Sequence, residues 1–300
     1  MFKRVLTATG IPGACEPALV TALEIAKQNQ GKLFILHVME ATYRHECGPQ
    51  EAVKDFRTGE GVAPSHEYKE AVKDELNKKC SDALKPYGNY EMNVVEGRPG
   101  IEIRRWARKV GADLIVLGPH VEREETNELD GSPRYNTVEE VITHITSPVM
   151  IVNSFFQKRT PDFGKILVCI DFSRSCEYAC RFATELSRKY GSKLFIFHMA
   201  HAHSAEKQGE ATAIRQKLAD FCRIPQGIEH EYIVWEGTQP SLDILKIAGE
   251  KQVDIVVMGS HVKETGKKWY MGSAVDQVSA KCPSPVAVIT HPDAVLKAES

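Results

Sequence analysis

Short apolar runs alternate with segments of helical period along the whole chain, and the same order of runs occurs twice. In each half, five runs rich in Val, Ile, Leu and Phe are separated by stretches whose apolar residues recur every three or four positions. Apolar runs without polar alternation are typical of strands buried on both faces. The pattern predicts an α/β protein with two repeated open parallel sheets, each of five strands flanked by four helices.

The two halves correspond run by run. "KRVLTAT" at 3–9 matches "GKILVCI" at 164–170, and "SPVMIVN" at 147–153 matches "SPVAVIT" at 284–290. The first strands are 161 residues apart, whereas Gly118 and Gly259 are 141 apart, so the first half carries about 20 extra residues between positions 40 and 70. This insertion, at 40–65, is polar and glycine-bearing, which is compatible with a lid or with an exposed loop.

The repeat predicts two domains, at residues 1–153 and 164–293, and a chain of 300 residues has room for both cores. The connecting segment "NSFFQKRTPDFG" contains Pro161 and Gly164, which interrupt regular structure. The following helix is expected to begin at Ser173 or Ser175, either of which can cap it, and to end at Gly191.

Composition narrows the class of protein. The hydrophobic fraction of 42% and charged fraction of 26% are typical of a soluble globular protein. A net charge of −2 argues against a general binder of nucleic acid or membrane surfaces. The eight cysteines form no CxxC pair, the opening "MFKRVLTATG" lacks an apolar signal core, and no apolar run approaches the roughly 20 residues of a membrane span. We therefore expect a cytoplasmic location.

A candidate ligand site lies in the second half. Asp171 follows its first strand and Gly259 ends its fourth, so both face one crevice if these strands are neighbours at the reversal of strand order. A helical pattern then begins at Gly272 and Ser273, and a helix N-terminus favours an anion. The nine residues before Gly272 hold three lysines and one glutamate, a net charge of +2.

The first half lacks this chemistry. Gly10 occupies the position of Asp171, and the matching segment "EREETNELD" holds five acids and one arginine, a net charge of −4. Pro133 also removes an N–H group from the corresponding helix start. If one half binds a nucleotide, it is the second.

The chain resembles a known family over nearly its whole length, once in each half. "KILVCIDFS", "LFIFHM", "DIVVMGSH", "MGS" and "SPVAVIT" in the second half resemble the universal stress protein family. The resemblance implies a Rossmann-like fold of the adenine nucleotide alpha hydrolase type, with the halves paired through their last strands as an intramolecular pseudo-dimer. It also implies a stress-response regulatory protein that binds ATP or another adenine nucleotide, with or without Mg²⁺.

The resemblance extends to individual positions. Asp171 matches the acidic residue that contacts adenine, Met199 an apolar position near the base, and Gly259, Gly272 and Ser273 the phosphate-binding loop. The full set implied for the nucleotide is Ile170, Asp171, Met199, Met258, Gly259, His261, Val262, Gly272, Ser273 and Ala274. Val262 departs from the family pattern, because it stands where nucleotide-binding members have a second glycine, and a β-branched residue disfavours positive φ.

Two further hypotheses stay open. The first is an interaction scaffold that binds protein partners but no nucleotide, with further homodimerisation undecided. The second is a metal or redox sensor built on His198, His201 and His203 or on Cys176 and Cys180. His198 recurs as His37 at the same strand position, which favours a scaffold role for the histidine, and the cysteines fit core thiols. No residue pattern indicates a nucleophile or general base, so binding is expected rather than dedicated catalysis.

Overall fold

The computed structural model describes most of the chain. The described residues are 1–10, 17–42, 52–55, 58, 60–119, 137–156, 161–201, 208–260, 263–265 and 268–295. His261 and Val262, together with the first half's acidic segment at 122–130, lie outside these ranges. None of the helices in the described ranges is both long and apolar enough to cross a membrane.

The two halves share a succession of five principal strands and four helices, to which the first half adds β3 and β4 and the second adds β12 and β13. The first contains β1 (Arg4–Ala8), α1 (Pro17–Gln28), β2 (Lys32–Thr42), β3 (Ala52–Lys54), β4 (Gly61–Val62), α2 (His66–Leu84), β5 (Tyr90–Gly97), α3 (Pro99–Val110), β6 (Leu114–Leu117), α4 (Thr137–Ile142) and β7 (Val149–Ile151). The second contains β8 (Lys165–Cys169), α5 (Arg174–Tyr190), β9 (Lys193–His201), α6 (Gln208–Cys222), β10 (His230–Gly237), α7 (Pro240–Lys251), β11 (Ile255–Gly259), β12 (Lys263–Thr265), β13 (Lys268–Tyr270), α8 (Ser273–Lys281) and β14 (Val286–Ile289).

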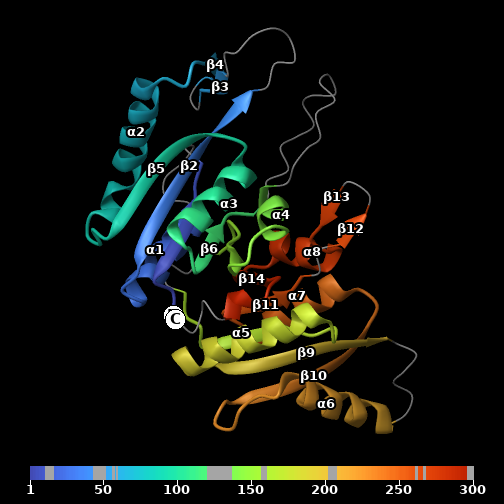
Figure 1. The fold of residues 1–300 in the computed structure, drawn as a ribbon. Coiled ribbons are helices and arrows are strands. Elements are labelled where there is room, and N and C mark those ends of the chain that lie inside the picture. Colours follow the sequence, from blue (N-terminus) through green and yellow to red (C-terminus); the bar gives the residue numbers. More distant parts are fainter. Residues whose placement is uncertain are drawn as a thin grey trace.

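One twelve-stranded sheet runs through both halves (Figure 1). Within each half the five principal strands are parallel, in the order β5-β2-β1-β6-β7 and β10-β9-β8-β11-β14. The halves meet where β7 pairs antiparallel with β14, with Met150 opposite Ala287. The predicted fold class and the pairing of the halves through their last strands are therefore confirmed.

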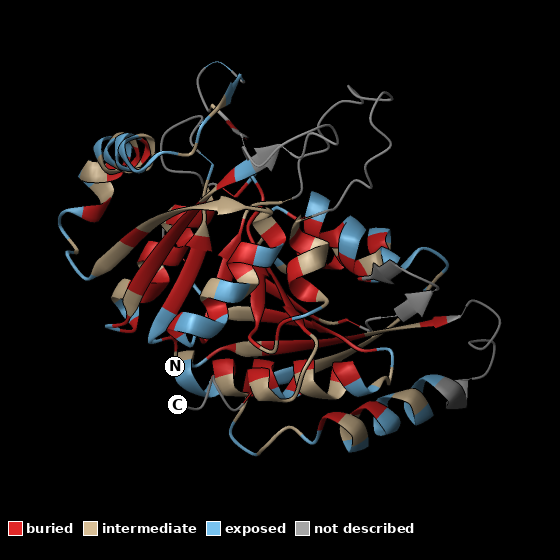
Figure 2. Ribbon diagram, turned by 45° about the horizontal axis from the view of Figure 1, so that its top comes forward, coloured by how far each residue is buried: buried red, intermediate tan, exposed pale blue. Residues whose placement is uncertain are grey.

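Helices cover both faces of this sheet. One hydrophobic cluster packs α1, α2, α5 and α6 on one face, and a second packs α3, α4, α7 and α8 on the other. Adjacent strand residues such as Leu167 and Val168 are both fully buried, because each points into one of the two clusters. Figure 2 shows buried residues concentrated in the central strands. Because the strands are buried on both faces, their sequences are uninterrupted apolar runs.

Helix α5 illustrates how local sequence sets an element's ends. Ser173 is its N-cap, and the Ser173 hydroxyl accepts a hydrogen bond from the Cys176 N–H at 3.4 Å. Gly191 ends the helix with φ +67°, in the left-handed region that favours glycine. Of the two caps that the sequence offered, Ser173 is the one used, and Ser175 is buried inside the first turn.

The described part of the insertion extends the sheet. Strand β3 pairs antiparallel with the end of β2, with Ala41 opposite Val53, and β4 pairs with β3. Val53 is fully buried. In Figure 1 these short strands lie beside the carboxyl end of β2.

Candidate functional site

The two strand ends predicted to flank a ligand site lie at the carboxyl edge of the second half. Strand β8 lies between β9 and β11. The chain runs outward from β8 through β9 to β10 and then crosses to β11 on the other side of β8, so the strand order reverses between β8 and β11. Cys169 pairs with Met258, which brings the residues that follow, Asp171 and Gly259, to the same edge. Ligands bind at this kind of reversal in open α/β sheets.

Asp171 is exposed, and its carboxylate already has partners. Asp171 Oδ1 accepts hydrogen bonds from the Ser173 N–H at 2.8 Å and from Cys176 Sγ at 3.0 Å. Burial, followed by the neighbouring Asp171 charge, raises the pKa of the Cys176 thiol to about 12. The thiol therefore stays protonated near neutral pH and orients the carboxylate at the start of α5.

The residue after Asp171 has an unusual backbone. Phe172 has φ +63°, which is uncommon for a residue with a bulky side chain. Its ring lies 4.6 Å from the His198 ring and 5.5 Å from the Phe221 ring, and Lys217 Nζ lies 3.9 Å from its centre. These contacts on β9 and α6 hold the turn that presents Asp171. Phe172 was not predicted as a site residue, since positive φ in a phenylalanine has no local sequence signature.

His198 and His37 occupy equivalent positions in the two halves, and each connects two strands of its own half. His198 Nδ1 lies 2.8 Å from the Ile170 carbonyl oxygen, and His37 Nδ1 lies 2.9 Å from the Thr9 carbonyl oxygen. Burial lowers the pKa of His37. Each histidine links its strand to the end of the neighbouring first strand. No group of three or more His, Cys, Asp or Glu within the described ranges is placed to hold a metal ion.

The other apolar candidates divide between the two faces of the sheet. Met258 is buried in the cluster under α7 and α8, and Met199 and Ala274 are half-buried against the same cluster. Ile170 is buried in the opposite cluster, under α5 and α6. Met199, Met258 and Ala274 thus lie on one face, whereas Ile170 can contact a ligand there only through its backbone.

The glycines at the crevice have different physical roles. A Cβ on Gly259 would lie 2.5 Å from the Cys176 nitrogen, so the end of β11 needs glycine to accept the first turn of α5. Gly272 has φ +85° and is the N-cap of α8. As a glycine it has no side chain with which to make a capping hydrogen bond. Ser273, the first residue of α8, is exposed.

Between these glycines the chain forms a short hairpin, in which β12 pairs antiparallel with β13 and Lys263 lies opposite Tyr270. Met271 follows the hairpin and is 2% exposed. The Ser260 hydroxyl donates to the Met271 carbonyl oxygen at 2.7 Å, and the Met271 N–H donates to Glu139 Oε1 at 3.1 Å. Glu139 belongs to α4 of the first half, a contact that sequence reasoning did not find.

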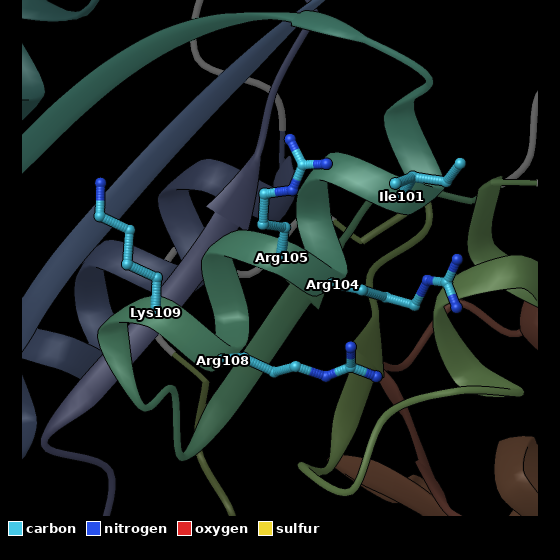
Figure 3. A pocket seen from close by; sticks show the side chains of 5 residues that line it. All are labelled: Ile101, Arg104, Arg105, Arg108 and Lys109. Atoms are coloured by element: carbon cyan, nitrogen blue, oxygen red, sulfur yellow. The ribbon is translucent and has the colours of Figure 1, made fainter.

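A hollow on the surface lies elsewhere, on α3 of the first half (Figure 3). It is lined by Ile101, Arg104, Arg105, Arg108 and Lys109. The equivalent positions on α7 are Leu242, Leu245, Lys246, Gly249 and Glu250, so only the first half has four basic residues there. This basic face of α3 was not predicted from the sequence.

Nearby acids offset part of this charge. Arg104 Nη2 lies 3.4 Å from Glu140 Oε1, and Arg105 Nη1 lies 2.9 Å from Glu102 Oε1. Arg108 donates to the His144 carbonyl oxygen at 3.1 Å. The Arg105 side chain is nevertheless 69% exposed, so the basic face remains accessible to solvent.

Two repeated α/β units, joined edge to edge through β7 and β14, define a tandem α/β protein. The profile described as "Universal stress protein family" matches residues 1–153 and again residues 162–290. The chain therefore belongs to the universal stress protein family and is a stress-response protein of tandem organisation.

Two solved structures that match nearly the whole chain share its fold. A universal stress protein from Archaeoglobus fulgidus is 20% identical, with 97% of each chain covered and a TM-score of 0.65. A putative universal stress protein from Pseudomonas aeruginosa is 16% identical, covers 99% of this chain and 96% of its own, and has a TM-score of 0.60. A shorter Archaeoglobus fulgidus protein, solved in complex with dAMP, is 24% identical over 43% of this chain and 99% of its own, with a TM-score of 0.35. No curated protein matches the chain.

Proposed function

We propose that the chain binds an adenine nucleotide in its second half and acts as a regulatory protein in the stress response. The nucleotide lies at the carboxyl ends of β8 and β11. Asp171 accepts hydrogen bonds from the base or sugar, Met199 and Met258 pack near the base, and the N–H groups around Ser273 hold phosphate. ATP and other adenine nucleotides, with or without Mg²⁺, fit this chemistry.

One observation carries this proposal. The reversal of strand order between β8 and β11 coincides with Asp171 at one strand end and Gly259 at the other. The chain after Gly259 leads to Gly272 and to the N-terminus of α8, whose first N–H groups suit an anion. An acidic side chain thus follows one of two neighbouring strands, and a helix start suited to an anion comes after the other, which supports a nucleotide bound between them.

The first half, residues 1–153, has a different role in this proposal. Its first strand is followed by Gly10, which has no carboxylate to offer a base. We assign it packing and interaction, while residues 164–293 hold the ligand.

Calorimetric titration of adenosine, AMP, ADP and ATP into the intact chain tests the proposal. We expect one nucleotide per chain, with binding weakened at least tenfold by Asp171→Ala and by Gly272→Glu. Asp220→Ala is the matched control, since it removes an exposed carboxylate from the same half at the end of α6. Absence of heat with all four ligands would refute the proposed site.

A second candidate function, an interaction scaffold, is favoured by the basic face of α3, which is present in only one half. Charge reversal at Arg105 and Arg108 would then abolish capture of an acidic partner protein. If capture persists at physiological salt in the doubly reversed variant, this face is not the interaction surface.

A further inference from the structure

A second hollow adjoins the one on α3. It lies between α3 and the first residues of β1 and β2, and Arg4, Lys32 and Trp106 are among the residues that line it. Lys109 lines both hollows. The basic face of α3 therefore continues onto the amino ends of two strands of the first half.

Six basic side chains of the two hollows form what we call the extended basic surface. They are Arg4, Lys32, Arg104, Arg105, Arg108 and Lys109. Three acids lie within ion-pair distance of members of this set, namely Glu91, Glu102 and Glu140. Six positive charges against three negative ones leave a net charge of +3.

The cations on α3 are crowded. Arg104 and Arg108 are four residues apart, as are Arg105 and Lys109, and like charges at this spacing destabilise a helix. Arg104 and Arg108 point toward α4, whereas Arg105 and Lys109 project from the other side of α3 (Figure 3). Attraction to the helix dipole accounts for the cations of the last turn, Arg108 and Lys109, but not for the two that lie one turn earlier. Helix stability alone therefore does not explain the cluster.

The second half has the same scaffold without this excess of positive charge. Three of its six equivalent positions are basic, namely Lys165, Lys193 and Lys246. The position of Lys109 is occupied there by Glu250. Since the two halves share their fold, the additional cations of the first half are not needed to build it.

The second half also has one more acid beside the start of its second strand. Lys193 Nζ lies 2.8 Å from Glu229 Oε1. The register of β9 against β10 is that of β2 against β5, which places Asn89 at the position of Glu229. The first half thus has more cations and one acid fewer at this surface, so a negatively charged partner is the one that complements it.

Apolar side chains accompany the cations. Ile101 lines the first hollow and is 37% exposed, and the half-buried Trp106 ring lies with its centre 4.0 Å from Lys109 Nζ. Arginine and tryptophan are enriched at the energetic centres of protein interfaces. The Glu91 side chain, 41% exposed, would repel the continuous phosphates of a nucleic acid, whereas a protein can place a neutral or basic residue opposite it. These features favour a protein over a nucleic acid.

We propose that the extended basic surface docks a protein partner through a segment that is rich in Asp and Glu and also carries apolar side chains. This inference rests on the scaffold role proposed above and does not depend on nucleotide binding. The carboxylates of the segment pair with Arg105, Arg108 and Lys109, and its apolar side chains contact Ile101 and Trp106. Because these cations are exposed, the attraction weakens as the salt concentration rises.

Fluorescence anisotropy with the intact chain and a labelled peptide tests the proposal. The peptide consists of glutamates with a leucine at every fourth position, and the same peptide with glutamine in place of glutamate is its control. We expect the acidic peptide to bind with an affinity that falls with salt, and the glutamine peptide not to bind. Arg105→Gln combined with Lys109→Gln should weaken binding about three- to tenfold, because two exposed cations are removed.

A matched control removes the same charge from the second half. Lys246→Gln combined with Lys281→Gln takes two exposed lysines from α7 and α8, and the affinity for the peptide should stay unchanged. Ile101→Ser should weaken binding as well, which a purely ionic attraction would not produce. If the double variant on α3 fails to fold, Arg105→Gln alone, at a side chain that is 69% exposed, should still weaken binding.

The outcomes separate the proposals. Equal weakening by the two double variants shows unspecific attraction and overturns the docking site. Binding of a single-stranded oligonucleotide in place of the peptide overturns the choice of a protein partner. No binding of the acidic peptide by the wild-type chain at low salt overturns the inference altogether, while calorimetry with adenine nucleotides still judges the proposed nucleotide site by itself.

Discussion

The Cys176 thiol donates a hydrogen bond to Asp171 Oδ1 over 3.0 Å, and this contact ties the end of β8 to the first turn of α5. The same carboxylate oxygen accepts from the Ser173 N–H at 2.8 Å. Asp171 is therefore both an exposed candidate for base recognition and a part of the turn that begins the helix. Its orientation is set before any ligand arrives, which lowers the entropic cost of binding.

The free energy of unfolding should decrease in alkaline solution because of the Cys176 thiol. The folded state raises the pKa of Cys176 to about 12 from an ordinary value of 9.0, chiefly by burial. Between these values the unfolded chain loses a proton that the folded chain keeps, so the free energy of unfolding decreases as pH rises. One such thiol contributes about 1.4 kcal/mol per pH unit.

Urea unfolding of the wild type and of Cys176→Ala between pH 8 and 10.5 measures this slope. Cys282 and Tyr232, whose pKa values are raised to about 11 and about 12, act in the same direction in both proteins. The difference between the two slopes isolates Cys176. Identical slopes would show that the thiol titrates alike in the folded and unfolded chains.

Gly259→Ala should destabilise the protein by about 1–3 kcal/mol, through overpacking. The added Cβ would lie 2.5 Å from the Cys176 nitrogen and from the Ser175 carbonyl carbon, and backbone atoms cannot rotate away. Gly249→Ala within α7 is the matched control, because its Cβ meets no described atom within 4 Å beyond its own helix. The control should gain about 0.4–1 kcal/mol. Chemical denaturation of both variants gives the comparison, and equal effects would contradict the close approach of α5 to β11.

Phe182→Ala should cost about 3–5 kcal/mol, since the Phe182 side chain is fully buried between α5 and the sheet and its removal leaves a cavity. Phe155→Ala is the control. The Phe155 side chain is 65% exposed, so its truncation should change the free energy of unfolding by less than about 0.5 kcal/mol. A small effect at Phe182 would mean that α5 packs loosely against the sheet.

Ala287→Asp should disrupt both halves at once. Ala287 is fully buried on β14, opposite Met150 on β7, so an aspartate there would place an unpaired charge at the junction. Hydrogen exchange should show protection falling together in β6 of the first half and β11 of the second. Ala213→Asp, at an exposed position of α6, should leave both strands protected. Loss of protection in β11 alone would show that the halves fold independently.

Local sequence was sufficient for much of the fold. The apolar runs predicted two five-stranded units because each central strand is buried on both faces, and Ser173 and Gly191 marked the ends of α5 through capping chemistry. The repetition of His37 as His198 predicted a structural role, and both histidines contact the carbonyl at the end of the neighbouring strand. These features depend on a few consecutive residues or on the repeat itself, so the amino-acid order carries them.

The sequence by itself determined that the chain is a tandem α/β protein, which half carries Asp171 at a strand end, and where a helix start suits an anion. Only the tertiary structure decided that β8 and β11 are neighbours, that Ile170 faces away from Met199, and that Glu139 reaches Met271. The last contact joins residues 132 positions apart. No local pattern encodes such a pair, because it exists only after β7 and β14 have brought the two halves together.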